Sequence, residues 1–173
     1  MAALVEAAAR PDCSYEVALV ASDRPEAAGL AWAHERGIAT FALSPRCIGK
    51  AAYEAEIDAA LRDAGVRTIA LAGYMRLLSD RFVADWRDRI VNIHPSLLPL
   101  YKGLDTHERA IAAGDAVAGC SVHVVTEELD AGEVLGQAQV PIVPGDTAET
   151  LAARVLVEEH RLYPRVLAEY VTR

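Results

Sequence analysis

Strand-like and helix-like segments alternate along nearly the whole chain, and this alternation restricts the fold more than any other feature of the sequence. Short apolar runs predict strands, and longer segments that end at a glycine predict helices. Their alternation is typical of a mostly parallel sheet with helices on both faces. We therefore predict an α/β fold of the Rossmann-like, doubly wound type, in one domain that covers residues 1–173.

Local signals predict the individual elements. Strands are expected at residues 15–20, 38–43, 68–72, 90–94, 120–126 and 134–140, and helices at 1–9, 27–36, 51–64, after Ser79, at 106–113 and after Asp146. Ser79 can cap the short fourth helix. Asp146 and Glu149 resemble a capping box for the last helix. Pro164 should kink or split that helix, because proline lacks the N–H that a helix interior needs.

The beginning of the chain departs from the doubly wound pattern. It opens directly on a helix-like segment, with no strand and no glycine-rich turn before it. A fold of this type normally places its anion-binding loop between the first strand and that helix. We therefore expect the first strand to be missing and the chain to be truncated at its N-terminus.

Composition excludes several classes of protein. The net charge of −8 argues against broad nucleic-acid binding, although one local basic pocket for a phosphate is compatible with it. We expect a cytoplasmic protein, because no apolar stretch approaches the roughly 18 to 20 residues that span a bilayer, and no signal peptide is present. The three cysteines, Cys13, Cys47 and Cys120, are widely spaced, so we expect reduced thiols and no metal site.

The sequence Asn-Ile-His-Pro-Ser-Leu-Leu-Pro at residues 92–99 ends a predicted buried strand. Residues two apart on a strand share a face, so Asn92 and His94 should project together. The prolines cannot continue the strand ladder and limit the entropy of the loop, so these side chains should be held in place. A hydrogen-bond donor beside an acid/base suits chemistry at a carbonyl group.

Four segments together resemble the folate-dependent glycinamide ribonucleotide formyltransferases: residues 92–99, 103–107, 121–123 and 128–132. The resemblance covers nearly the whole chain and implies a formyltransferase fold. By motif, it implies Asn92, His94 and Asp130 as catalytic residues. It places Met75, Arg76, Leu77, Leu78, Asn92 and Lys50 at the folate co-substrate, and Glu159 at the ribonucleotide sugar.

Three departures from the family pattern stand out. The family's first strand and its Gly-x-Gly-Ser-Asn loop, which holds the substrate phosphate, would precede Met1, and family members usually extend beyond Arg173, so we expect truncation at both ends. Asp105 stands where many bacterial members have histidine. Lys50 stands where an arginine is common, and keeps the charge but not the two-pronged guanidinium.

The resemblance implies transfer of the formyl group of 10-formyltetrahydrofolate to the amine of glycinamide ribonucleotide in purine synthesis. It implies no metal and no nucleic-acid or membrane partner, in a monomer or homodimer. The alternatives are a formyltetrahydrofolate deformylase, a methionyl-tRNA formyltransferase, or an inactive, truncated chain that binds folate. His94-Pro95-Ser96 differs from the His-His-Ser of deformylases, and the basic C-terminal domain of the tRNA enzymes is absent.

Several of these residues also have plainer interpretations. A lone histidine at a strand end is more often packed than catalytic, and Asp-Ala-Gly at residues 130–132 is a common turn. Residues 75–78 could equally be core residues, and Glu159 could belong to the exposed face of a helix. We leave His107 and His123 outside the catalytic set, as possible supporting residues.

Overall fold

The computed structural model describes residues 1–173 except for the side chain of Cys47, so the expectation of a reduced Cys47 lies outside the described residues. The helices are α1 (Ala2–Ala8), α2 (Ala28–His34), α3 (Gly49–Asp63), α4 (Asp80–Asp85), α5 (Thr106–Ala113) and α6 (Ala148–Tyr170), with a 3-10 turn, η1 (Pro45–Cys47). The strands are β1 (Val20–Ser22), β2 (Thr40–Ala42), β3 (Ile69–Leu71), β4 (Ile90–His94), β5 (Val117–Val124) and β6 (Val134–Pro141).

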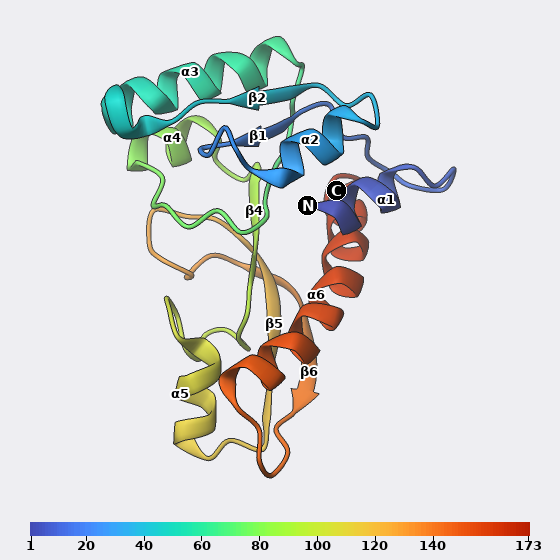
Figure 1. The fold of residues 1–173 in the computed structure, drawn as a ribbon, viewed down its shortest axis with the longest axis vertical. Helices are drawn as coiled ribbons and strands as arrows, with labels where there is room; N and C mark the ends of the chain where they lie inside the picture. The colour runs from blue at the N-terminus through green and yellow to red at the C-terminus, as the bar shows by residue number, and fades with distance from the viewer.

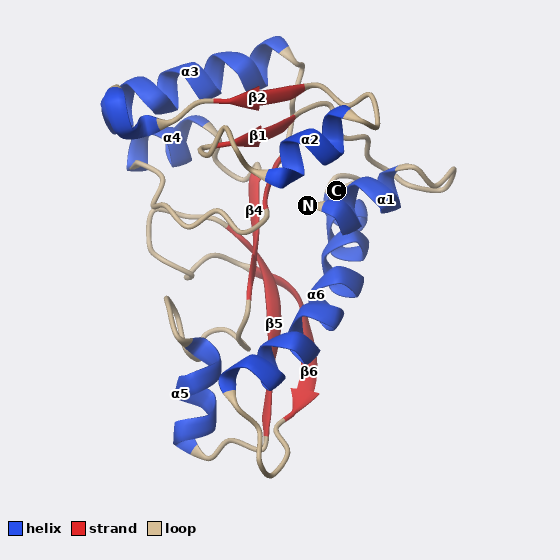
Figure 2. Cartoon of the chain, in the orientation of Figure 1, coloured by secondary structure: helices blue, strands red, loops and turns tan.

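The strands form two sheets, which confirms the α/β class. β1 and β2 pair in parallel, and the second sheet has the order β3-β4-β5-β6. β3 and β4 are parallel, whereas β5 and β6 run antiparallel to their neighbours. In Figure 1 the β1-β2 pair lies with α2 and α3 at one end of the molecule, and α6 runs alongside the long strands β5 and β6. Figure 2 shows the two sheets in red, with β4 reaching from one end of the molecule toward the middle.

Two apolar clusters hold β4 in place. One packs α6 against β4 and β5 through residues such as Val91, Val122 and Leu151, and the other surrounds Trp86. The buried hydroxyl of Tyr163 on α6 donates to the carbonyl oxygens of Leu71 at 3.0 Å and of Val91 at 2.8 Å. The helix is thereby tied to β3 and β4 at once, which fixes the strand that ends at His94.

The last helix differs from its prediction in two ways. Thr147, not Asp146, is the N-cap, and it forms the capping box with Thr150 rather than Glu149. Asp146 instead accepts hydrogen bonds from the guanidinium of Arg154 and from the Val143 N–H, and this pairing holds its pKa well below the usual range. The expected split at Pro164 is also wrong, because α6 continues through that residue to Tyr170.

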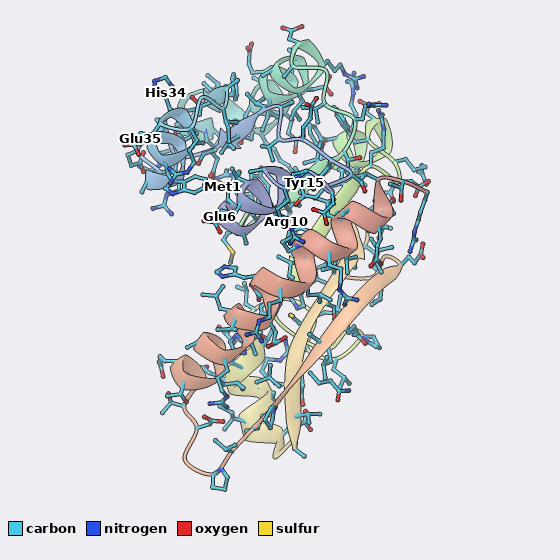
Figure 3. The ribbon with its side chains drawn as sticks, turned by 90° about the vertical axis from the view of Figure 1, so that its right-hand side faces the viewer. Met1, Glu6, Arg10, Tyr15, His34 and Glu35 are labelled. Atoms are coloured by element: carbon cyan, nitrogen blue, oxygen red, sulfur yellow. The ribbon has the colours of Figure 1, made fainter. Side chains whose placement is uncertain are left out.

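The first strand is shorter than predicted and begins later. Residues 15–19 are irregular, and β1 covers only the three residues that pair with β2. Tyr15 instead turns back to α1, where its hydroxyl donates to the Leu4 carbonyl oxygen at 3.0 Å. Figure 3 shows Met1 and Tyr15 together at α1, beside α6.

None of the described helices is long and apolar enough to cross a membrane.

Candidate active site

The pairing of β4 with β5 sets out the centre of the site. Asn92 lies opposite His123, and His94 lies opposite Ser121. Since side chains alternate along a strand, the amide and both imidazoles emerge on the same face of the sheet. Residue His123 is 2% exposed and His94 is 6% exposed, so the face is largely closed to solvent.

Asp130 reaches this face from the loop between β5 and β6. Its carboxylate oxygen Oδ2 lies 3.4 Å from Nδ1 of His94, and Oδ1 lies 3.5 Å from Nε2 of His123. Oδ2 also accepts a hydrogen bond of 2.9 Å from the Gly103 N–H. Asn92, His94, His123 and Asp130 thus form one group, which we call the polar cluster. The structure brings together all three residues that the sequence predicted as catalytic.

A close backbone approach lets the Asp130 loop fold back onto β5. An ideal Cβ at Gly132 would lie 1.9 Å from the Val124 carbonyl oxygen, so only glycine fits there. Asp130 itself has a φ of 48°, in the left-handed region that aspartate tolerates better than most residues. The Asp-x-Gly sequence is therefore needed to place the carboxylate.

Each ring nitrogen of His94 lies next to a hydrogen-bond acceptor. Its Nε2 lies 3.0 Å from the Tyr101 carbonyl oxygen, on the side away from Asp130. Both neighbours are oxygen acceptors, so a ring nitrogen that bonds to either of them must do so as a donor. Tyr101 and Asp130 lie on different loops, so the His94 ring is oriented from two directions.

A buried serine anchors the loop after β4. The Ser121 hydroxyl donates to the Ser96 carbonyl oxygen at 2.6 Å and accepts from the Leu98 N–H at 2.9 Å. Gln137 on β6 donates to the same hydroxyl at 2.8 Å and to the Leu98 carbonyl oxygen at 2.9 Å. These bonds fix residues 96–98 to β5 and β6, as the prolines of this loop suggested.

The residue that the sequence interpretation underestimated is His123. Its Nδ1 lies 3.0 Å from the Val124 carbonyl oxygen, and its Nε2 lies 3.2 Å from Nδ2 of Asn92. Burial lowers the pKa of this imidazole, against the opposing effects of the Val124 carbonyl and the Asp130 carboxylate. The signal available in the sequence was a histidine within a mostly apolar strand, on the same predicted face as Ser121.

His107, the other histidine left outside the catalytic set, is on the first turn of α5. Its Nδ1 is buried without a hydrogen-bond partner among the described atoms. Burial, reinforced by His94, lowers the pKa of His107. Among the side chains that the structure describes, no group of three or more His, Cys, Asp or Glu could hold a metal ion.

The residues expected at the co-substrate lie after β3 and are more exposed. Met75 is 77% exposed and Leu77 is 69% exposed, whereas Leu78 packs against the Trp86 cluster. The Arg76 guanidinium lies 3.8 Å from the Asp23 carboxylate, which follows β1. The segment 75–78 therefore offers two exposed apolar side chains, Met75 and Leu77, while Arg76 and Leu78 contact the rest of the protein.

Lys50 and Glu159 lie on two different helices. Lys50 is exposed in the first turn of α3. Glu159 is half-buried on α6, where burial raises its pKa and the Met1 amino group opposes that effect. The structure brings neither side chain into the polar cluster through a hydrogen bond or an ion pair among the described residues.

Comparison with known proteins gives one consistent family. The sequence pattern of the family described as formyl transferase matches residues 1–167. The crystal structure of a phosphoribosylglycinamide formyltransferase from Brucella melitensis is 54% identical, with a TM-score of 0.92, over 97% of this chain and 87% of that one.

The curated relatives include one protein of similar length and one much longer trifunctional protein. The phosphoribosylglycinamide formyltransferase of Escherichia coli is 41% identical over 96% of this chain and 79% of its own length. The bovine trifunctional purine biosynthetic protein adenosine-3 is 40% identical over 95% of this chain. The chain spans only 16% of the length of that larger protein.

Proposed function

The chain belongs to the formyl transferase family, and from that membership we propose that it transfers a formyl group from 10-formyltetrahydrofolate to the primary amine of glycinamide ribonucleotide. This reaction belongs to purine synthesis. The relatives named above support this acceptor, since they carry the name phosphoribosylglycinamide formyltransferase or purine biosynthetic protein. We also propose that the protein is cytoplasmic and that it is a monomer or a homodimer.

The observation that carries the proposal is the polar cluster. An amide, an imidazole and a carboxylate from distant parts of the chain converge, with His94 and Asp130 each having side chains that are 8% exposed. Formyl transfer needs groups of these three kinds in one place, because it develops a negative oxygen and must also move a proton.

The chemistry can be followed atom by atom. The substrate amine attacks the formyl carbon, a C–N bond forms, and the carbonyl oxygen becomes negative. The Asn92 amide donates a hydrogen bond to that oxygen, an interaction whose loss costs about 3–4 kcal/mol in other acyl-transfer sites, and Nδ1 of His94 can exchange its long 3.4 Å contact with Asp130 for a second hydrogen bond to the oxygen. The bond to N10 of the folate then breaks, and N10 gains the proton that the attacking nitrogen loses.

Asp130 has two roles in this scheme. Its carboxylate orients the His94 ring through the 3.4 Å contact of Oδ2 with Nδ1. It also lies where it can help the proton leave the attacking ammonium, directly or through a water molecule. The Gly103 N–H holds the carboxylate for both roles.

The remaining assignments concern binding. We propose that Met75, Arg76, Leu77 and Leu78 line the folate pocket, with the exposed Met75 and Leu77 covering apolar parts of the co-substrate. Lys50 supplies a positive charge near the substrates, and Glu159 contacts the ribonucleotide sugar. These binding roles rest on the family motif and on exposure, not on contacts within the polar cluster.

The test compares acceptors for the formyl group. Purified protein is incubated with 10-formyltetrahydrofolate and, separately, glycinamide ribonucleotide, water alone or methionyl-tRNA. We expect formylated glycinamide ribonucleotide as the product and only slow deformylation in water. Faster hydrolysis than transfer, or formylation of the tRNA alone, would replace this proposal with one of the two alternative enzymes. Tight folate binding without any turnover would support an inactive folate-binding chain.

A further inference from the structure

The polar cluster contains one histidine for which the proposed reaction has no direct use. His123 is fully buried on β5 and faces Asn92 across the ladder. Its ring nitrogens both have neighbours within the protein, the Val124 carbonyl oxygen at 3.0 Å and the Asn92 amide nitrogen at 3.2 Å. The residue is therefore set to act on Asn92 rather than on a substrate.

The Val124 contact determines which ring nitrogen carries the proton. A carbonyl oxygen can only accept a hydrogen bond, so Nδ1 of His123 must be the donor. Burial favours the neutral ring, which leaves Nε2 without a proton. Nε2 is then an acceptor only.

This acceptor in turn determines how the Asn92 amide is oriented. An acceptor needs the amide nitrogen, not the amide oxygen, as its neighbour. Nε2 of His123 lies 3.2 Å from the amide nitrogen and 3.5 Å from Oδ1 of Asp130, so this one ring nitrogen neighbours both side chains. Turned the other way, Asn92 would present its oxygen to this unprotonated ring nitrogen, and neither atom could donate a hydrogen bond.

We propose that His123 is a positioning residue that holds the Asn92 amide with its nitrogen toward Nε2 of the imidazole. One N–H of Asn92 bonds to His123, and the second is then directed at the developing oxyanion. Because Nε2 carries no proton, His123 does not compete with His94 for the Asp130 carboxylate. The inference deepens the proposed function and rests on it for the identity of the oxyanion.

Two substitutions separate the two nitrogens of the ring. In His123→Asn the amide nitrogen can replace Nδ1 and keep the bond to Val124, but the acceptor at Nε2 is lost. In His123→Gln the longer side chain places its oxygen near the Nε2 position and keeps the acceptor for Asn92. We expect kcat to fall about 10²-fold in His123→Asn, the size typical of a misplaced catalytic group. The loss in His123→Gln should be about tenfold smaller, with KM for folate unchanged in both.

A double-mutant cycle tests whether His123 acts through Asn92. In an Asn92→Ala background, His123→Asn should cause almost no further loss of kcat, because the group that it positions is already gone. Equal losses in His123→Asn and His123→Gln, wild-type activity in His123→Asn, or additive losses in the cycle would each overturn the proposal.

The tautomer provides a readout that needs neither activity nor variants. ¹⁵N NMR of the histidine-labelled wild-type protein, with the signal of His123 assigned, should show Nδ1 protonated and Nε2 unprotonated at neutral pH. The opposite tautomer, or a doubly protonated ring, would contradict the positioning role. If the protein failed to formylate glycinamide ribonucleotide but showed the expected tautomer, the proposed function would fail while the arrangement of His123 and Asn92 stood.

Discussion

The polar cluster contains two residues of β4, and the segment 75–78 follows β3, the parallel neighbour of β4, yet the fold holds the two regions in opposite ways. Around the cluster, the Gly103 N–H and the carbonyl oxygens of Tyr101 and Val124 each fix one side chain. In the other segment Met75 and Leu77 extend into solvent. The difference separates two tasks. Groups that stabilise a transition state are fixed in advance by hydrogen bonds, whereas groups that bind an incoming ligand remain exposed.

The largest effect should come from Asp130, on the preorganised side of this comparison. Asp130→Asn keeps the shape and can still accept from Gly103, but it removes the charge beside His94. We expect kcat to fall by about 10²- to 10⁴-fold, the range typical of a lost acid–base group, with little change in thermal stability. Steady-state kinetics and a thermal melt measure the two quantities.

The matched control is Asp85→Asn at an exposed ion pair on α4. Asp85→Asn should change neither kcat nor thermal stability, since exposed pairs contribute little to stability. Wild-type turnover in Asp130→Asn would show that the carboxylate near His94 is only a structural acceptor.

The second effect should come from the close approach that brings Asp130 to the cluster. Gly132→Ala would place a methyl group 1.9 Å from the Val124 carbonyl oxygen, so the loop must shift. We expect the free energy of unfolding to fall by about 1–3 kcal/mol, and kcat to fall with it, as chemical denaturation and kinetics would measure.

Gly114→Ala is the control for the glycine itself. Gly114 has a φ of 73° and no atom within 4 Å of an added Cβ, so it should lose about 1–2 kcal/mol of stability and no activity. Full kcat in Gly132→Ala would show that catalysis does not depend on the precise placement of the Asp130 carboxylate.

The open segment should respond through binding rather than turnover. Replacing both Met75 and Leu77 by alanine should weaken binding of a folate analogue roughly tenfold, since each side chain covers apolar surface of the ligand. Stability should be unchanged, because both side chains are exposed. Leu78→Ala should instead lower the free energy of unfolding by about 2 kcal/mol. Equal stability losses in both variants, by denaturation, would remove the distinction between the open and the packed residues of this segment.

The smallest effect concerns pH and the buried ring of His123. Because burial lowers its pKa in the folded state, the unfolded chain binds a proton first as the pH falls. The contribution of His123 is complete above about pH 6.5, the unfolded value, and is lost progressively below it. Thermal midpoints at pH 7.5 and 5.5 should therefore differ more in the wild type than in His123→Gln. The same difference in both proteins would assign the pH dependence to other groups, such as His107.

Much of the frame was predictable because it depends on local chemistry. β4 covers Ile90–His94 as expected, Ser79 caps α4 with a hydrogen bond to the Phe82 N–H, and α5 ends at Gly114. In each case the signal and its cause lie within a few residues. The predicted capping box of Asp146 and Glu149 is wrong. Asp146 pairs with Arg154, eight residues along the chain, and Thr147 caps the helix instead. No local pattern could report that competition.

The candidate site was predictable in part for the same reason. Asn92, His94 and Asp130 carry side chains that a motif can register. The Tyr101 carbonyl and the Gly103 N–H belong to the backbone, so no residue type marks them. His123 was set aside because its role arises from pairing with Asn92, which requires the register of β4 and β5. The supporting contacts thus depend on tertiary structure, whereas the reactive groups do not.

We expect the imidazole between Asp130 and the Tyr101 carbonyl to serve the reaction and not the fold. A single-turnover experiment with His94→Ala and isotopically labelled formyl-folate tests it most directly. We expect the variant to bind the labelled folate with unchanged affinity and to deliver its label to glycinamide ribonucleotide at least about 10²-fold more slowly than the wild type. Delivery of the label at the wild-type rate would contradict it.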